Sequence, residues 1–138
     1  MLIMAAPTGA RRMKSDHPEI PLTIPETVAT ARECREAGAD AFHLHIRNKD
    51  GAHSIDAGLY SEALAEIAQA VPEMPVQITT ESGGIFDVTQ QLATLRDLRP
   101  SWAFLCIREV ARDEAIAPTI YDLCRAQGTK LQHILFDQ

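Results

Sequence analysis

The sequence predicts an α/β fold in which parallel strands alternate with helices. Two observations carry this prediction. Short apolar segments alternate with amphipathic helical segments, and successive strand-like segments recur at a spacing of about 30 residues. The chain has 138 residues, of which 46% are hydrophobic, so it can bury one modest core and one domain is expected.

The first half of the chain contains two strands and two helices. Residues 2–6 are a short apolar run, which predicts a strand. The segment 25–39 predicts a helix, because Pro25 suits a first helical turn and a glycine lies near the end. Residues 40–47 alternate apolar and polar side chains, as a strand does. The segment 57–71 predicts an amphipathic helix whose apolar stripe comprises Leu59, Ala63, Ile67 and Ala70.

The second half continues the alternation. Residues 75–80 predict a third strand, followed by a glycine-containing loop and a helix over 86–100 that ends at a proline. Residues 101–109 predict a fourth strand. A helix is expected over 112–129, with an internal proline that kinks it or shifts its start, and a fifth strand over 130–137.

Two topologies fit this order, a doubly wound open sheet and a (β/α)₈ barrel. Strands of a doubly wound sheet are covered on both faces and should be continuously apolar. The strand at 40–47 instead has one polar face, with His43, His45 and Arg47, and the next strand repeats this with Gln77 and Thr79. A barrel accepts polar side chains that point inward near its mouth, so the barrel is favoured.

A complete (β/α)₈ barrel takes about 250 residues. The chain is therefore expected to supply about the first five strands and four helices, as the N-terminal part of a single TIM-barrel domain over 1–138. Either this is a piece of a longer protein, which is favoured, or another subunit closes the barrel. Because the first and fifth strands would be open edges, association of the isolated chain is expected.

Composition excludes several classes of protein. The net charge of −6 and scattered basic residues argue against a nucleic-acid partner. No apolar run is long enough to span a membrane, and the N-terminus does not resemble a secretory signal. Three cysteines without CxxC spacing predict reduced, buried thiols and a cytoplasmic location: Cys34, Cys106 and Cys124.

His43 and His45 are the most specific chemical feature. Alternate residues of a strand share one face, so both imidazoles can reach one metal ion, and zinc is the expected metal. A third ligand must come from elsewhere. The alternative is that one histidine is a hydrogen-bonded core residue and the other faces solvent. Arg47 on the same face and Glu109 at the end of the fourth strand are candidate catalytic residues.

Two loops that follow strands are candidate substrate contacts. Ser82 and Gly83 offer a hydroxyl and backbone N–H groups that can hold a carboxylate or oxyanion. Thr8 and Gly9 occupy the corresponding position after the first strand, near basic residues that can meet anionic groups. The alternatives are an ordinary strand-to-helix turn and a solvated loop.

Several motifs resemble the β-keto acid cleavage enzymes, typified by the 3-keto-5-aminohexanoate cleavage enzyme. The matching stretches are PTGA, DHPEIPLTIPE, AGADAFHLHIR, DGAHSID with LYSEAL, and ITTESGG. The likeness extends over residues 1–138 and is strongest over 5–84. The HLHxR sequence after AGA is rather specific.

The resemblance implies a (β/α)₈ barrel that binds a divalent metal, typically zinc, through His43, His45 and a later glutamate. It implies that a β-keto acid condenses with acetyl-CoA to give acetoacetate and a new acyl-CoA, without a redox cofactor. Ser82 and Gly83 would contact the substrate. A homo-oligomer, with tetramers typical of the family, is expected.

The chain departs from the family pattern at three places. Asn48 stands where the family often has Asp, FLCIREV replaces an Asn-rich strand, and the late RVGLED segment is missing. In a divergent branch, Glu109 or His133 is a candidate third ligand. Two alternatives to the cleavage enzyme therefore remain: a metal-dependent hydrolase of TIM-barrel type and a non-catalytic half-barrel.

Overall fold

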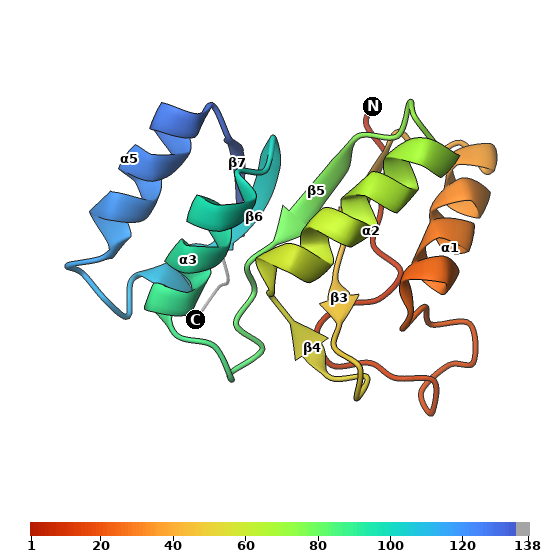
Figure 1. The fold of residues 1–138 in the computed structure, drawn as a ribbon, viewed down its shortest axis with the longest axis horizontal. Helices are drawn as coiled ribbons and strands as arrows, with labels where there is room; N and C mark the ends of the chain where they lie inside the picture. The colour runs from red at the N-terminus through yellow and green to blue at the C-terminus, as the bar shows by residue number, and fades with distance from the viewer. Residues whose placement is uncertain (135–138) are drawn as a thin grey trace.

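The computed structural model describes residues 1–134 and contains one main sheet of five parallel strands (Figure 1). Their order across the sheet, β1-β2-β5-β6-β7, is also their order along the chain. Their bounds are Met4–Ala5, Ala41–Leu44, Val76–Thr79, Trp102–Cys106 and Lys130–Ile134. A doubly wound sheet reverses its strand order at a switch point, and this sheet has no reversal. The α/β fold and the parallel sheet are thus consistent with part of a TIM barrel.

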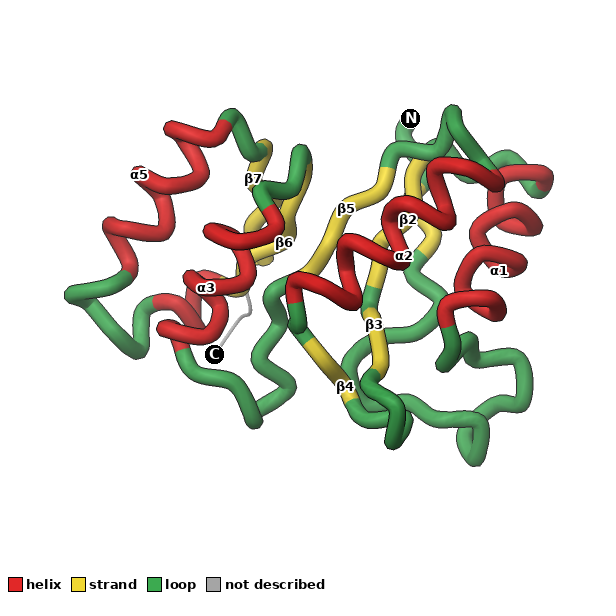
Figure 2. Tube along the Cα trace, viewed as in Figure 1, coloured by secondary structure: helices red, strands yellow, loops and turns green. Residues whose placement is uncertain are grey.

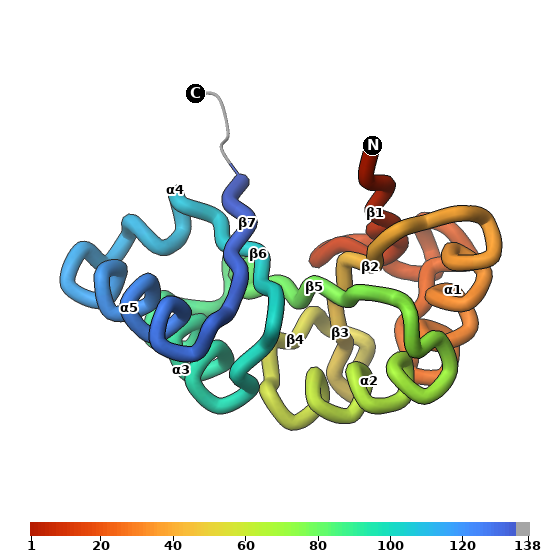
Figure 3. The backbone as a smooth tube through the Cα atoms, turned by 90° about the horizontal axis from the view of Figure 1, so that it is seen from above, coloured from red at the N-terminus to blue at the C-terminus, as the bar shows by residue number. Residues whose placement is uncertain are grey.

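Four helices cover one face of this sheet. They are α1 (Ile24–Glu36), α2 (Ala57–Ala70), α3 (Val88–Leu98) and α5 (Ala117–Gln127). Figure 3 shows the strands as a curved row with these helices on its convex side, and β1 and β7 at the two ends. The core fills the space between the sheet and the helices. Its fully buried members include Phe42, Leu44, Ile78, Leu105 and Ile120.

Side-chain caps explain where three of the helices begin. Thr23 and Glu26 form a reciprocal capping box at the start of α1, and Asp87 and Gln90 form another at α3. Asp56 accepts the N–H of Leu59 at the start of α2. The predicted helices therefore exist, with bounds shorter by a few residues.

The prediction of one strand over 40–47 is wrong in its second half. Strand β2 ends at Leu44, and β3 (Ile46–Arg47) pairs antiparallel with β4 (His53–Ser54) in a separate hairpin (Figure 2). The side chain of Asn48 accepts the N–H groups of Asp50 and Ala52, which closes the hairpin turn. The chain therefore leaves the main sheet at His45.

The fourth predicted strand and the last predicted helix also need correction. Strand β6 ends at Cys106, and residues Ile107–Val110 form a helical turn, α4. The carboxylate of Asp113 accepts the N–H groups of Ala115 and Ile116, so the chain turns before α5 begins at Ala117. Pro118 thus lies in the first turn of α5 and shifts its start rather than kinking it. Of the predicted strand 130–137, the structure places 130–134 in β7; residues 135–137 lie outside the described part.

The three cysteines are free thiols, as predicted; Cys106 and Cys124 are buried, whereas Cys34 is half-buried. Within residues 1–134, no helix combines the length and the apolar character that crossing a membrane requires.

Candidate active site at the strand ends

The predicted site residues gather at the carboxyl ends of the strands. In Figure 1 the arrowhead of β5 points to the edge where β3 and β4 lie. His43 and His45 come from the end of β2, and the loop from Glu81 to Gly83 follows β5. Thr8 and Gly9 lie in the loop after β1, and Glu109 lies in α4 after β6. This is the edge at which parallel α/β folds place ligands.

The two strand histidines face each other. Their Nε2 atoms are 3.2 Å apart and their ring centroids 5.0 Å apart. Two lone pairs at this distance repel, so the contact requires a proton on one nitrogen or a shared cation. Two ligand atoms at about 2.0–2.1 Å from one tetrahedral zinc ion lie about 3.3 Å from each other. The observed separation therefore fits a pair of ligands to one ion.

Two side-chain amides in series determine which ring nitrogen of His43 carries the proton. The Nδ1–H of His43 donates to the Gln77 side-chain oxygen over 2.7 Å, and the Gln77 amide in turn donates to Gln132 over 2.7 Å. Because Gln77 presents its oxygen, the proton of His43 lies on Nδ1 and the lone pair on Nε2. This support is what a metal-binding histidine requires.

Burial keeps these histidines neutral. It lowers the pKa of His45 to about 2, with repulsion from His43, His53 and Arg47 adding to the effect. Burial is also the largest influence on the pKa of His43 and lowers it, an effect that the hydrogen bond from His43 to Gln77 partly offsets. At neutral pH both rings are thus in the form that binds a metal.

His53 is a third imidazole of this site and was not predicted from the sequence pattern. Its Nε2–H donates to the Glu81 carbonyl over 2.7 Å, and its ring centroid lies 5.4 Å from that of His45. Its Nδ1 has no partner among residues 1–134, and neither does Nδ1 of His45. The antiparallel pairing of Arg47 with His53 brings His53 to the site, so only recognition of the hairpin would have found it.

Arg47 is buried and holds the loop after β1. Its guanidinium donates to the carbonyl of Gly9 over 2.6 Å and to that of Arg12 over 3.2 Å. The backbone of Gly9 has a φ of 66°, which favours glycine. Thr8 in the same loop is buried. Arg47 thus shapes the loop that was expected to contact the substrate.

Ser82 and Glu109 form a buried hydrogen-bonded unit. The N–H and the hydroxyl of Ser82 donate to the Glu109 carboxylate over 2.8 Å and 2.7 Å. The Gln91 amide donates to the same carboxylate over 3.0 Å. Gly83, next in the loop, has a φ of 57°. Glu109 therefore fixes the loop after β5, and Gly83 allows it to turn.

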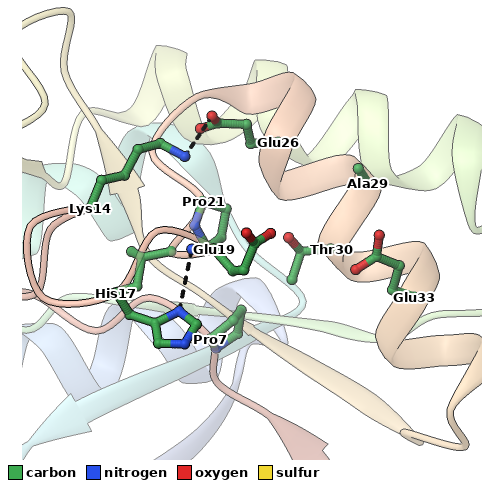
Figure 4. A pocket seen from close by; sticks show the side chains of 10 residues that line it. Pro7, Lys14, His17, Glu19, Pro21, Glu26, Ala29, Thr30 and Glu33 are labelled. Carbon is green, nitrogen blue, oxygen red and sulfur yellow. Dashed lines mark hydrogen bonds and ion pairs between the residues drawn. The ribbon is translucent and has the colours of Figure 1, made fainter.

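A cavity of about 400 Å³ opens at this edge of the sheet. Gly9, Glu81 and Glu109 line it, together with Arg11 and Arg12. A larger cavity of about 610 Å³ lies between the loop after β1 and the helix α1 (Figure 4). None of the predicted site residues lines that second cavity, whereas Gly9 and Glu109 both line the first, which is therefore the better candidate for a substrate site.

The structure also bears on the expected third metal ligand. As the side chains stand, no three His, Cys, Asp or Glu residues within 1–134 are arranged to hold a metal ion. The carboxylate of Glu109 already accepts three hydrogen bonds. His133 stacks on Tyr121 of α5, with ring centroids 5.7 Å apart, and so points to the helix side of the sheet. Neither residue is brought to the histidine pair.

Comparison with known proteins agrees with this picture. The sequence profile of the beta-keto acid cleavage enzyme family matches residues 1–138. The chain belongs to this family. It is 32% identical over 109 residues to the 3-oxoadipate:acetyl-CoA acetyltransferase of Cupriavidus necator, covering 79% of this chain and 38% of that enzyme.

Two relatives are named 3-keto-5-aminohexanoate cleavage enzyme. That of Acetoanaerobium sticklandii is 32% identical over 91 residues, covering 66% of this chain and 33% of the enzyme. That of Fusobacterium nucleatum is 30% identical over 106 residues, covering 76% and 38%. The chain thus spans less than two fifths of the length of these relatives. The predicted family is confirmed, and transferase or keto acid cleavage chemistry is supported at the level of the family.

Proposed function

We propose that the protein is a metal-dependent β-keto acid cleavage enzyme. In this reaction the CH₂–COO⁻ unit of a β-keto acid leaves its acyl group and bonds to the acetyl carbon of acetyl-CoA. The CoA thiolate passes the other way, so the products are acetoacetate and a new acyl-CoA. The observation that carries the proposal is the facing pair of neutral imidazoles at the strand ends of a member of this family.

His43 and His45 would hold the divalent ion, for which zinc suits two imidazole ligands. When bound, such an ion polarises a carbonyl and stabilises negative charge on its oxygen. Gln77 orients His43 for this role. The buried position of His45, 4% exposed, excludes water from one side of the pair.

The two loops would bind and orient the acid. Arg47 fixes Thr8 and Gly9, and Glu109 fixes Ser82 and Gly83. Because both donors of Ser82 already reach Glu109, the roles of Glu109 and Ser82 in the proposal are to position the loop. The N–H of Gly83 has no acceptor among residues 1–134 and is the donor left for a substrate carboxylate.

The proposal includes a (β/α)₈ barrel in a homo-oligomer. Within residues 1–134, β1 and β7 each pair on one side only. Further strands, of the same protein or of a second copy, would cover these edges. Light scattering tests this, since the isolated 1–138 chain should associate, and a stable monomer would contradict it.

Family membership favours this reaction over the metal-dependent hydrolase that the sequence also allowed. The test measures acetoacetate formed from acetyl-CoA and a β-keto acid such as 3-oxoadipate, together with bound zinc. His43→Ala and His45→Ala should each abolish metal binding and turnover. His17→Ala, an exposed histidine outside the site, is the matched control and should change neither. Zinc retained at full stoichiometry in both site variants would refute the metal site, and bound zinc without turnover on any β-keto acid would favour a non-catalytic role.

A further inference from the structure

We propose that the cavity at the strand ends selects a β-keto acid with a second carboxylate, at the end remote from the reacting group. Arg11, in the loop after β1, and Arg108, in α4, are the residues that recognise this second carboxylate. The inference rests on the proposed function, which concerns the reacting end of the acid, and adds the class of substrate.

One cavity connects these two arginines with the histidine pair. Both arginines line the cavity of about 400 Å³, and so do Glu81 and Phe104. The ring of Phe104 packs edge-on against His43, with ring centroids 5.2 Å apart. Oε2 of Glu81 lies 3.8 Å from Nε2 of His45. The volume is in the range of small-molecule sites, so a short acid can lie near the histidines at one end and near the arginines at the other.

The lining of this cavity is cationic, although the chain as a whole is acidic. The net charge of the chain is −6, whereas the described part of the cavity wall carries three arginines and two glutamates. The carboxylate of one of these, Glu109, accepts three hydrogen bonds from Ser82 and Gln91 and is thereby directed to the loop after β5. A cleft with an excess of positive charge attracts anions.

Arg11 has no partner for its charge in the part of the chain that the structure describes. Its side chain is exposed and makes neither a hydrogen bond nor an ion pair with residues 1–134. Its neighbour Arg12, in contrast, is paired with Asp16 over 3.1 Å. A guanidinium presents N–H groups in a planar fork that matches the two oxygens of a carboxylate. Arg11 is therefore available to bind a carboxylate that enters the cavity.

A buried cation in contact with the same loop adds to this positive charge. Arg47 is 7% exposed and donates to the carbonyls of Gly9 and Arg12, while its Nε has no hydrogen-bond partner within residues 1–134. In the same range no carboxylate pairs with it. A buried charge without a counter-ion is costly, so an anion bound nearby stabilises it.

Two anionic groups of the reactants are possible ligands, the second carboxylate of the acid and a phosphate of acetyl-CoA. The position of the cavity favours the carboxylate. The acetyl group reacts at the thioester, which the whole pantetheine arm separates from the phosphates. The two carboxylates of a short diacid are separated by a few carbon atoms. One small cavity that reaches the histidine pair suits the shorter span.

The test is isothermal titration calorimetry with two unreactive acids of equal chain length, adipate and hexanoate. The parent protein should bind adipate about tenfold more tightly, which corresponds to one hydrogen bond between charged groups. Arg11→Ala should remove most of this preference and leave the affinity for hexanoate unchanged, which also shows that the variant is folded. Arg11→Lys keeps the charge and should retain part of the preference.

Two further variants complete the test. Arg108→Ala should reduce the preference for adipate, because Arg108 lines the same cavity. Arg32→Ala, at an exposed position of α1 outside the cavity, is the matched control and should keep the preference of the parent protein.

The outcomes separate this inference from the proposed function. Equal binding of adipate and hexanoate by the parent protein would overturn the inference, and so would an undiminished preference in both Arg11→Ala and Arg108→Ala. Titration with CoA examines the phosphate alternative: weaker CoA binding by Arg11→Ala with the adipate preference intact would also overturn it. Failure of the proposed function has a different result, since no β-keto acid would then yield acetoacetate while the adipate preference and its dependence on Arg11 would persist.

Discussion

The two faces of the main sheet are formed by the same strands, but different interactions determine which side chains each face carries. On the convex face, Phe42 and Leu44 of β2 are buried against helices at 1% and 0% exposure. On the concave face, His43 of the same strand contacts Gln77 and Phe104 and remains half-buried. Apolar burial therefore determines one face, whereas hydrogen bonds between side chains of different strands determine the other.

This difference between the two faces indicates which parts of the chain determine its stability and which determine its chemistry. The convex face depends on the amount of apolar surface removed from water, so many side chains of similar size would serve there. The concave face depends on the placement of single atoms, such as the Gln77 oxygen that holds the proton on His43 Nδ1. Substitutions on the two faces should thus have effects of different kinds.

The largest expected effect is the loss of a large side chain from the convex face. Phe42→Ala should lower the free energy of unfolding by about 3–5 kcal/mol, because Phe42 is buried in the core. Phe104→Ala removes the same side chain from the half-buried concave face and should cost less than half as much. Urea unfolding of both variants measures the difference. Equal losses of unfolding free energy in the two variants would show that the side chains of the concave face belong to the core as those of the convex face do.

The next effect tests the concave face. Gln77→Leu keeps the size of the side chain but removes the acceptor of His43 and the donor to Gln132. Zinc affinity should fall by about 10–100-fold, as it does when a second partner of a metal ligand is removed. Thr89→Val, at an exposed position of α3, is a control for the loss of a polar group outside the site. Unchanged zinc affinity in Gln77→Leu would mean that His43 needs no orientation by Gln77.

The sequence predicted the convex face well because burial leaves a periodic pattern. The apolar stripe of α2 was expected from Leu59, Ala63 and Ile67, and Ala63 and Ile67 are indeed buried. The helices and the five main strands were found in the same way. The hairpin of β3 and β4 and the turn α4 were missed, because elements of two to four residues are too short to show a period.

The concave face was predicted only in part. His43 and His45 were found because two strand positions define their geometry locally. His53 and Glu81 were missed because each reaches the pair through tertiary structure. His53 does so through the hairpin, and Glu81, whose carboxylate lies 3.8 Å from Nε2 of His45, through the neighbouring strand. Neither neighbour lies within a few residues of the pair in the sequence, so spacing alone does not reveal them.

The loop after β5 connects the two faces of the sheet. A substitution of Gly83 tests how closely this loop is packed. A Cβ added to Gly83 would lie 3.0 Å from Cδ2 of His53, and φ there is 57°. Gly83→Ala should therefore cost about 1–2 kcal/mol for the left-handed backbone and more for the contact with His53. At Gly84, where φ is 85°, nothing lies within 4 Å of such a Cβ, so Gly84→Ala should show the backbone cost alone. Equal losses of unfolding free energy in the two variants would mean that the His53 ring can move away from the added methyl group at no cost.

The smallest effect on stability is expected on the outer surface of the helix layer. An exposed polar contact there serves as the reference for the buried ones. The hydrogen bond from Lys14, followed by the N–H groups of Leu22 and Thr23, lowers the pKa of Glu26 from 4.5 to about 2. A lowered pKa in the folded state stabilises the fold above the unfolded value, and this contribution is lost as the pH falls from about 4.5 to about 2. Glu26→Gln should thus reduce stability at pH 7 by no more than about 1 kcal/mol, because solvent screens the exposed Lys14 contact.

The pH dependence distinguishes this surface contact from the buried groups. Stability of the parent protein and of Glu26→Gln, measured by thermal unfolding, should converge as the pH falls from 4.5 toward 2. Glu33→Gln, at an exposed position of α1 outside the capping box, is the matched control for the loss of a glutamate. A gap between the parent and Glu26→Gln that persists at pH 2 would show that the glutamate acts through the shape of the helix cap rather than through its charge. The helix cap would then resemble the concave face of the sheet, because in both places the position of an atom would matter more than its charge.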